Sequence, residues 1–166
     1  MRLEDDAIRL RAFTEDDVPA IVAACQDPEI PRWTRVPAPY TEADARSFVA
    51  APPDQAFAIV DRVSGELAGA IGAHPDGDGR VEIGYWVVRE ARGRGVATRA
   101  LRLLARWAVE ELAAARMQLY TDPENTASQR VAEKAGFRRE GTLRSWVEIK
   151  GVRRDAVMYS LLPEDL

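Results

Sequence analysis

Cysteine and histidine are almost absent from this sequence. Its 166 residues include one of each, Cys25 and His74. A single cysteine excludes an intramolecular disulfide, and one cysteine with one histidine excludes a zinc site of the usual Cys and His spacing. Cys25 lies on the apolar face of a predicted helix, so we interpret it as a small buried hydrophobic residue and not as a nucleophile. We therefore expect no metal cofactor.

Long apolar runs and a strong excess of one charge are also absent. No run is long enough to span a bilayer, and the acidic start of the chain lacks the apolar segment of a secretory signal. The formal net charge of -4 shows no general footprint of nucleic-acid binding. We expect a cytoplasmic protein without a membrane or nucleic-acid partner. A local basic patch stays open, because arginines gather at Arg89, Arg92, Arg94, Arg99 and Arg102.

The composition is that of an ordinary globular protein, with 46% hydrophobic and 30% charged residues. We predict one domain over residues 1–166. Alternating and β-branched runs predict seven strands, at residues 8–13, 55–60, 66–73, 81–88, 117–120, 142–149 and 156–162. Gly69 and Gly72 interrupt the third of these strands, which indicates a bulge or a close backbone approach.

Capping patterns place four helices between these strands. Thr14 and Thr41 each start a capping box, Val96 starts a run with helical spacing, and Asn125 caps a helix that Gly136 ends. Residues 27–39 hold several prolines and are predicted as a loop. The order of elements predicts a mixed α/β fold with helices on a sheet, in which the strand at 81–88 reaches its successor by a parallel right-handed crossover.

The stretch from residue 81 to residue 104 is the centre of this pattern. It is a β-branched and aromatic strand, then a loop rich in arginine and glycine, then an amphipathic helix. A glycine loop at a helix start can hold a phosphate, because free N–H groups and the positive end of the helix dipole meet there. A Gly-x-Gly alone is also compatible with a simple tight turn.

Taken together, the blocks of this chain resemble the GNAT superfamily of acyl-CoA-dependent N-acetyltransferases. The loop R-G-R-G-V-A at 92–97 matches the family's glycine motif. E-I-G-Y-W-V from Glu82, N-T-A-S-Q-R-V-A-E-K-A-G-F from Asn125 and the tail from Gly141 are similar to the RimJ/RimL-like group, which acetylates protein N-terminal amines. The resemblance implies a twisted, mostly antiparallel sheet of six to seven strands, with a parallel crossover at the acetyl-CoA site and about four flanking helices.

The resemblance also implies the residues that hold acetyl-CoA. Backbone groups of Val87 and Val88 would bind the pantetheine, and a backbone N–H there would stabilise the oxyanion. Asn125 is either a helix cap or a further pantetheine contact. The pyrophosphate would lie on the N–H groups of the loop and the helix start, with arginines adding charge-assisted contacts. These residues are Arg92, Gly93, Arg94, Gly95, Val96, Ala97 and Thr98.

Catalysis needs a base for the amine and a donor for the departing thiolate. Glu82 matches the position of a general base in several family members, although an exposed strand carboxylate is the alternative. Many members carry an acidic Tyr seven residues after the Asn, but here this position is Ala132. By resemblance to RimL-like members, Ser128 would take the role of donor, unless it only caps its helix. Histidine is a common general base, so His74 is a second candidate, although it is also explained as a surface residue.

The remaining expectations concern the acceptor. Trp33, Tyr40, His74 and Trp146 are predicted to line the acceptor pocket, with core packing or exposure as the alternatives. The acceptor is a primary amine, either a protein N-terminus or a small molecule such as an amino acid, a polyamine or an aminoglycoside. A non-catalytic acyl-CoA-binding module is the rival from another class. We expect a monomer or a homodimer.

Overall fold

The protein is described from a computed structural model, which covers residues 3–53 and 55–166. Met1, Arg2 and Asp54 lie outside the described residues. The prediction of a domain over residues 1–166 and the expectation that the chain starts without a secretory signal both include Met1 and Arg2. The strands are β1 (Ile8–Arg11), β2 (Ala56–Asp61), β3 (Leu67–Pro75), β4 (Arg80–Val87), β5 (Arg116–Thr121), β6 (Arg138–Ile149) and β7 (Val152–Leu161). The α-helices are α1 (Val18–Cys25), α2 (Glu29–Trp33), α3 (Glu42–Ala50), α4 (Val96–Leu112) and α5 (Thr126–Ala135).

The seven strands form one sheet in the order β1-β2-β3-β4-β5-β7-β6. All neighbours pair antiparallel except β4 and β5, which are parallel and are joined through α4. The predicted mixed α/β fold, with a mostly antiparallel sheet and one parallel crossover, is therefore confirmed. Among the described residues, no helix combines the length and the apolar character needed to cross a membrane.

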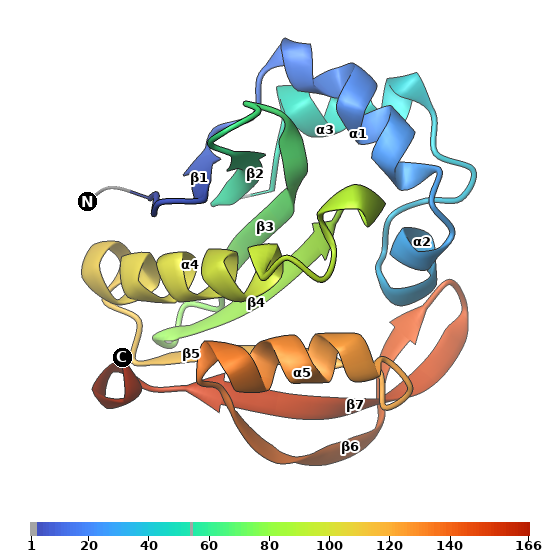
Figure 1. Cartoon of the computed structure of the whole chain (residues 1–166). Helices are drawn as coiled ribbons and strands as arrows, with labels where there is room; N and C mark the ends of the chain where they lie inside the picture. The colour runs from blue at the N-terminus through green and yellow to red at the C-terminus, as the bar shows by residue number, and fades with distance from the viewer. Residues whose placement is uncertain (1–2, 54) are drawn as a thin grey trace.

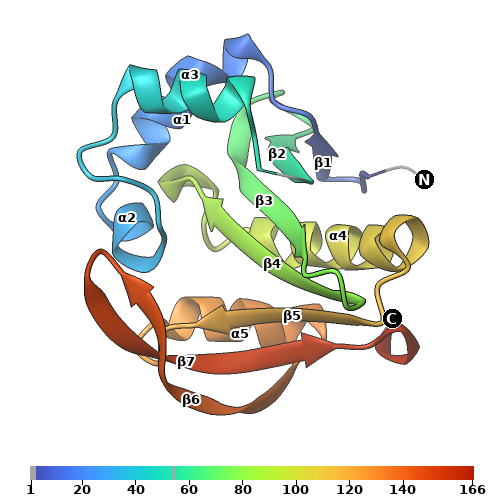
Figure 2. The same cartoon turned by 180° about the vertical axis from the view of Figure 1, so that it is seen from behind.

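Helices α4 and α5 cover one face of the sheet (Figures 1 and 2). α4 buries a stripe that packs on β1, β3 and β4, and its Leu101 and Leu104 have no exposed surface. Each such buried leucine stabilises the fold by about 1.5–3 kcal/mol. The first three helices surround a second apolar cluster that includes Trp86. Since side chains alternate along a strand, Trp86 faces away from Tyr85 and Val87, which belong to the main core under α4.

One predicted loop contains a helix. Residues 27–39 include α2, a five-residue helix with Pro28 as its N-cap and Pro31 in its first turn. Proline is tolerated there because the N–H groups of the first turn have no partner within the helix. The prediction of an irregular loop was therefore wrong for residues 29–33. The tail strands are also longer than predicted, since β6 begins at Arg138 and β7 at Val152.

The close packing of β3 against β4 explains the glycine at position 69. The register between β2 and β3 shifts at Ala68, next to Gly69, so the predicted bulge is present. A Cβ at Gly69 would lie 2.3 Å from the Trp86 carbonyl oxygen, which no side chain permits. β3 and β4 therefore approach each other closely at the end of β4 where the site lies.

Candidate functional site

A cavity of about 850 Å³ opens where β4 and β5 separate. The two strands pair only from Arg80–Arg116 to Glu82–Gln118, and beyond this point they diverge toward α2 (Figure 1). The cavity runs through this gap. Its walls come from β4, the start of α4, the end of β5 and α5 on one face of the sheet, and from α2, α3 and the tail strands on the other.

The glycine loop forms the cavity wall at the start of α4. Gly93 and Gly95 have φ values of 74° and 79°, and Gly95 is the N-cap of α4. The first turn of α4 holds no acidic residue, and its first backbone bond of the helical type runs from Arg99 N to Gly95 O. The N–H groups of Val96, Ala97 and Thr98 therefore have no partner within the helix. All three residues line the cavity, as do Gly93 and Gly95.

The arginines of the loop are paired within the protein. Arg94 contacts Asp61 at 3.2 Å, Arg99 contacts Asp5 and Asp6, and Arg89 contacts Asp27 at 3.0 Å. Arg102 donates to the Lys134 carbonyl. The basic patch that the sequence left open is thus largely neutralised by neighbouring carboxylates. At the glycine loop, the positive end of the cavity therefore comes from the helix start and not from the arginines of the loop.

Arg92 lines the cavity, and its guanidinium holds the end of β4. Its Nε and Nη2 atoms each donate to the Val87 carbonyl oxygen at 3.1 Å, and Nη2 lies 2.7 Å from Asp27 Oδ2. Asp27, which follows α1, is almost fully buried, and its hydrogen bond with Arg89 together with the charge of Arg92 lowers its pKa to about 2. Asp27 and Arg92 therefore tie the α1–α2 connection to the cavity end of β4.

We expect Asp27→Asn to lower the unfolding free energy by about 1 kcal/mol at pH 7, because both ion pairs are lost while Arg89 stays largely exposed. The Asp27 pKa is depressed in the folded state, so its contribution is present above the unfolded pKa near 3.8 and is lost as the pH falls toward 2. Denaturant unfolding from pH 7 downward should show the two proteins converging. Asp78→Asn, in an exposed loop, is the control. A constant difference down to pH 2 would contradict the ion-pair explanation.

The backbone of β4 presents one row of groups to the gap. Val88, the residue after β4, donates its N–H to Ala68 O at 2.9 Å, so the N–H groups of Val88 and Trp86 lie on the side of the strand that bonds to β3. The N–H groups of Tyr85 and Val87 then point toward the gap. The Val88 carbonyl is also occupied, by Ala91 N at 3.0 Å. Of the two residues predicted to bind pantetheine through their backbone, only Val87 keeps an N–H directed at the cavity.

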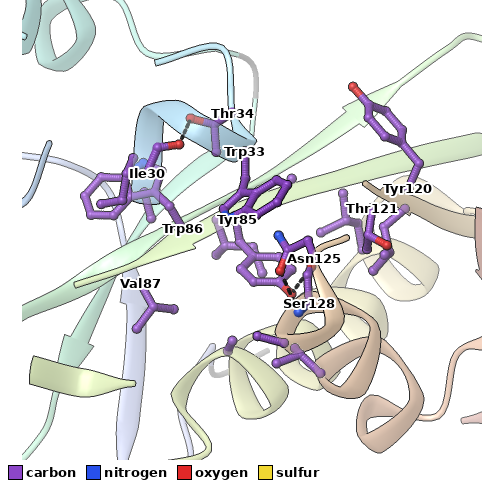
Figure 3. Close-up of a pocket in the computed structure, with 18 of the residues that line it drawn as sticks. Ile30, Trp33, Thr34, Tyr85, Trp86, Val87, Tyr120, Thr121, Asn125 and Ser128 are labelled. Carbon is purple, nitrogen blue, oxygen red and sulfur yellow. Dashed lines mark hydrogen bonds between the residues drawn. The ribbon is translucent and has the colours of Figure 1, made fainter. Parts of the chain in front are cut away.

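The sequence left open whether Asn125 or Ser128 caps α5, and the structure assigns the cap to Asn125. Asn125 Oδ1 accepts a hydrogen bond from Ser128 N at 3.1 Å, so Asn125 is the N-cap of α5. The Ser128 hydroxyl does not cap the helix. Its Oγ lies 2.8 Å from the hydroxyl oxygen of Tyr85, across the gap from β4 (Figure 3). Burial raises the pKa of Tyr85 to about 12, so its phenol is neutral at physiological pH.

Glu82 reaches the cavity from the opposite face of the sheet. It lies directly opposite His74 on β3 and Gln118 on β5, on the face away from the core residues Val81 and Ile83. Burial and then the negative charge of Glu82 raise the pKa of Tyr120, which is also in the cavity wall. The carboxylate and the Ser128 hydroxyl therefore border one cavity from two sides of the split sheet.

The predicted acceptor residues separate into two groups. Trp33 and His74 line the cavity, and Trp33 is held by a 3.0 Å hydrogen bond from its Nε1 to Glu29. Tyr40 and Trp146 do not contribute to the described lining: Tyr40 packs on the second apolar cluster, and Trp146 is 48% exposed on β6. Cys25 is buried, which raises its thiol pKa to about 12 and agrees with a packing role. Within residues 3–53 and 55–166, no three His, Cys, Asp or Glu side chains cluster as metal ligands.

The lining residues that sequence reasoning missed include Tyr85, Arg130 and Lys134. Tyr85 was counted only as a strand former, although its alternation with Trp86 places it on the face of α5. Arg130 and Lys134 project into the cavity wall from α5, four residues apart on one face of the helix. This i, i+4 pair of cations was the available signal, but only the packing of α5 beside the gap shows that the pair faces the site.

Comparison with known proteins identifies the family of this chain. The sequence profile of the acetyltransferase (GNAT) domain matches residues 7–138. The chain belongs to the GNAT acetyltransferase family. The resemblance inferred from the sequence is thereby confirmed. The matched segment includes the glycine loop of this chain, which lies at the start of α4 in the cavity wall.

Individual GNAT relatives are similar over different lengths. "Putative ribosomal N-acetyltransferase YdaF" from Bacillus subtilis (strain 168) is 37% identical over 103 residues, which cover 61% of this chain and only 56% of YdaF. A crystal structure of a GNAT-family acetyltransferase from Bacillus anthracis has a TM-score of 0.90 and 26% identity over 99% of both chains. RimL, a ribosomal alpha-N-protein acetyltransferase solved with coenzyme A, has a TM-score of 0.83 at 21% identity over both whole chains, which shows a shared fold.

Proposed function

We propose that this protein transfers an acetyl group from acetyl-CoA to a primary amine. The observation that carries the proposal is the cavity through the split sheet. It joins a helix start with unpaired N–H groups on one face to the Glu82 carboxylate on the other. An anionic, amide-rich thioester suits the first end, and a cationic amine suits the second.

The residues on the α4 and α5 face fit coenzyme A. The loop offers the unpaired N–H groups of α4 to a pyrophosphate, and a Cβ added at Gly93 or Gly95 would meet no atom within 4 Å, so the approach is open. Arg130 and Lys134 add positive charge to the same wall. Thr121 Oγ1 is buried without a hydrogen-bond partner among the described residues, which suits a polar ligand beside the gap. The Val87 N–H would donate to the thioester carbonyl oxygen as it gains charge.

The residues on the other face fit an amine acceptor. Glu82 would take the proton of the incoming amine, directly or through a water. Glu29, Asp122 and Asp155 also line the cavity, but Arg154 pairs with Asp122 and Arg32 pairs with Glu29, so Glu82 is the carboxylate on which the amine site depends. Because YdaF and RimL carry names of ribosomal N-acetyltransferases, a protein N-terminal amine is the acceptor to test first.

The test is turnover with a panel of amines. The purified protein should release free thiol from acetyl-CoA with at least one amine, and mass spectrometry should locate the acetyl group on nitrogen. Peptides that start with Ala or Ser represent protein N-termini, whereas free amino acids, a polyamine and an aminoglycoside represent small acceptors. Tight coenzyme A binding without thiol release on any amine would support a non-catalytic binding module. Absence of coenzyme A binding would overturn the proposed function.

A further inference from the structure

The hydrogen bond between Tyr85 and Ser128 carries an inference about how the leaving thiolate is stabilised. The two hydroxyl oxygens lie 2.8 Å apart, and the residues come from opposite walls of the gap, β4 and α5 (Figure 3). Both residues line the cavity. The tyrosine that many family members carry on this helix is replaced by the fully buried Ala132, one turn after Ser128. Tyr85 packs on the core cluster that contains Ala132, so a phenol reaches this region from the strand instead of from the helix.

Ser128 is free to act as a donor because Asn125 already caps the helix. A serine at this position often gives its oxygen to the helix start, which would turn its hydroxyl away from the cavity. Here the Asn125 side chain accepts from Ser128 N, and the Ser128 hydroxyl has the Tyr85 phenol as its partner. The two hydroxyl groups carry one proton each, and only one of these protons is used in the hydrogen bond between them. The other proton can be donated to a third group.

The relative acidity of the two hydroxyl groups determines which of them donates within the pair. A phenol is a stronger acid than an aliphatic hydroxyl, so in a Tyr–Ser pair the phenol is the better donor and the serine oxygen the better acceptor. Burial of Tyr85 keeps the phenol protonated, with a pKa of about 12, so that it retains a proton to donate. With Tyr85 donating to Ser128 Oγ, the Ser128 proton is the one directed to the cavity.

We propose that Tyr85 is a positioning residue that donates its hydrogen bond to Ser128 Oγ and thereby turns the Ser128 O–H toward the sulfur of acetyl-CoA. The inference rests on the proposed acetyl transfer. In that step the C–N bond forms, the C–S bond breaks, and its electron pair goes to sulfur. The proton of the amine goes to the Glu82 carboxylate, directly or through a water. Ser128 stabilises the thiolate by a hydrogen bond and keeps its own proton, so the leaving group is coenzyme A thiolate.

The first test separates turnover from binding. We expect Tyr85→Phe to lower kcat about tenfold and Ser128→Ala to lower it about a hundredfold. The KM for acetyl-CoA should change little, because the hydrogen bond from Ser128 to sulfur is strongest once negative charge forms on the sulfur. The double variant should be no slower than Ser128→Ala, since Tyr85 acts through Ser128. Tyr159→Phe is the matched control. Its hydroxyl also donates to a side chain of α5, Glu133 at 3.3 Å, but Tyr159 lies outside the described cavity lining.

The second test measures the hydrogen bond without turnover. The thiol of coenzyme A bound to the protein is titrated by its thiolate absorbance. We expect the pKa of that bound thiol to be at least about one unit higher in Tyr85→Phe and Ser128→Ala than in the wild type, and unchanged in Tyr159→Phe. Thermal unfolding checks that each variant is folded. Should Tyr85→Phe not fold, the titration of Ser128→Ala decides whether the sulfur has this donor.

Three outcomes overturn the proposal: an unchanged kcat in Tyr85→Phe, additive losses in the double variant, or bound-thiol titrations that do not shift. A wild type that binds coenzyme A but acetylates no amine argues against the proposed function alone. In that case the titration still decides whether Tyr85 and Ser128 form the donor chain.

Discussion

Replacing Gly95 with glutamate is expected to abolish binding of acetyl-CoA. Gly95 caps α4 with a φ of 79°, next to the three unpaired N–H groups that line the cavity. A glutamate here would place a negative charge where the phosphates are proposed to bind, and its side chain would compete for the same N–H groups. We expect the dissociation constant for coenzyme A to rise at least about a hundredfold, which corresponds to about 2.7 kcal/mol. Isothermal titration calorimetry measures it.

Two controls separate charge from backbone strain. Gly95→Ala adds only a Cβ, which would meet no atom within 4 Å, so its effect comes from the positive φ alone and should be about 1–2 kcal/mol of stability. Gly77→Glu adds the same side chain at nearly the same φ, 80°, in the loop between β3 and β4 outside the described lining. It should lose similar stability and keep full binding. Tight coenzyme A binding by Gly95→Glu would contradict the phosphate site at α4.

Replacing Glu82 with glutamine is expected to slow acetyl transfer about a hundredfold while coenzyme A still binds normally. Gln keeps the size and the hydrogen-bonding capacity of the side chain but cannot accept the proton of the amine, and general bases typically contribute this much. The deficit should be largest at low pH, where more of the amine is protonated and must lose a proton before attack. Thiol release followed across the pH range with a saturating amine measures the loss.

Glu111→Gln, at an exposed position near the end of α4, is the control for loss of one carboxylate. It should match the wild type in turnover and in binding. Equal rates for Glu82→Gln and the wild type at every pH would remove Glu82 from the mechanism. The next group to test would then be His74, which lies directly opposite Glu82 on β3.

Features close together in the sequence were predicted well. The glycine loop followed by an amphipathic helix is local, since backbone N–H groups at a helix start are left unpaired in any protein. The Asn125 cap and the Gly136 end of α5 follow from single-residue preferences, and both are present. α2 was missed because five residues with prolines carry no periodicity, and its stability depends on burying Ile30 in the second apolar cluster.

Features that join distant residues could not be predicted. Arg92 was expected on the phosphate but contacts Val87 and Asp27, because Asp27 is brought to it only by the packing of α1 beside β4. The division between Val87 and Val88 depends on hydrogen-bond register, and a shift of one residue would exchange their roles. Trp146 was expected in the cavity, but on β6 it is solvent-exposed.

By itself the sequence determined the family, the order along the chain of the strands and of every α-helix except α2, and the place of the glycine loop, because these depend on local patterns and on motifs. Only the tertiary structure decided the gap between β4 and β5, the opposite placement of Glu82 and Ser128, and the pairing of Tyr85 with Ser128. Tyr85 and Ser128 are 43 residues apart. Their contact exists because β4 and α5 pack on either side of a split sheet, and no local preference of either segment encodes that arrangement.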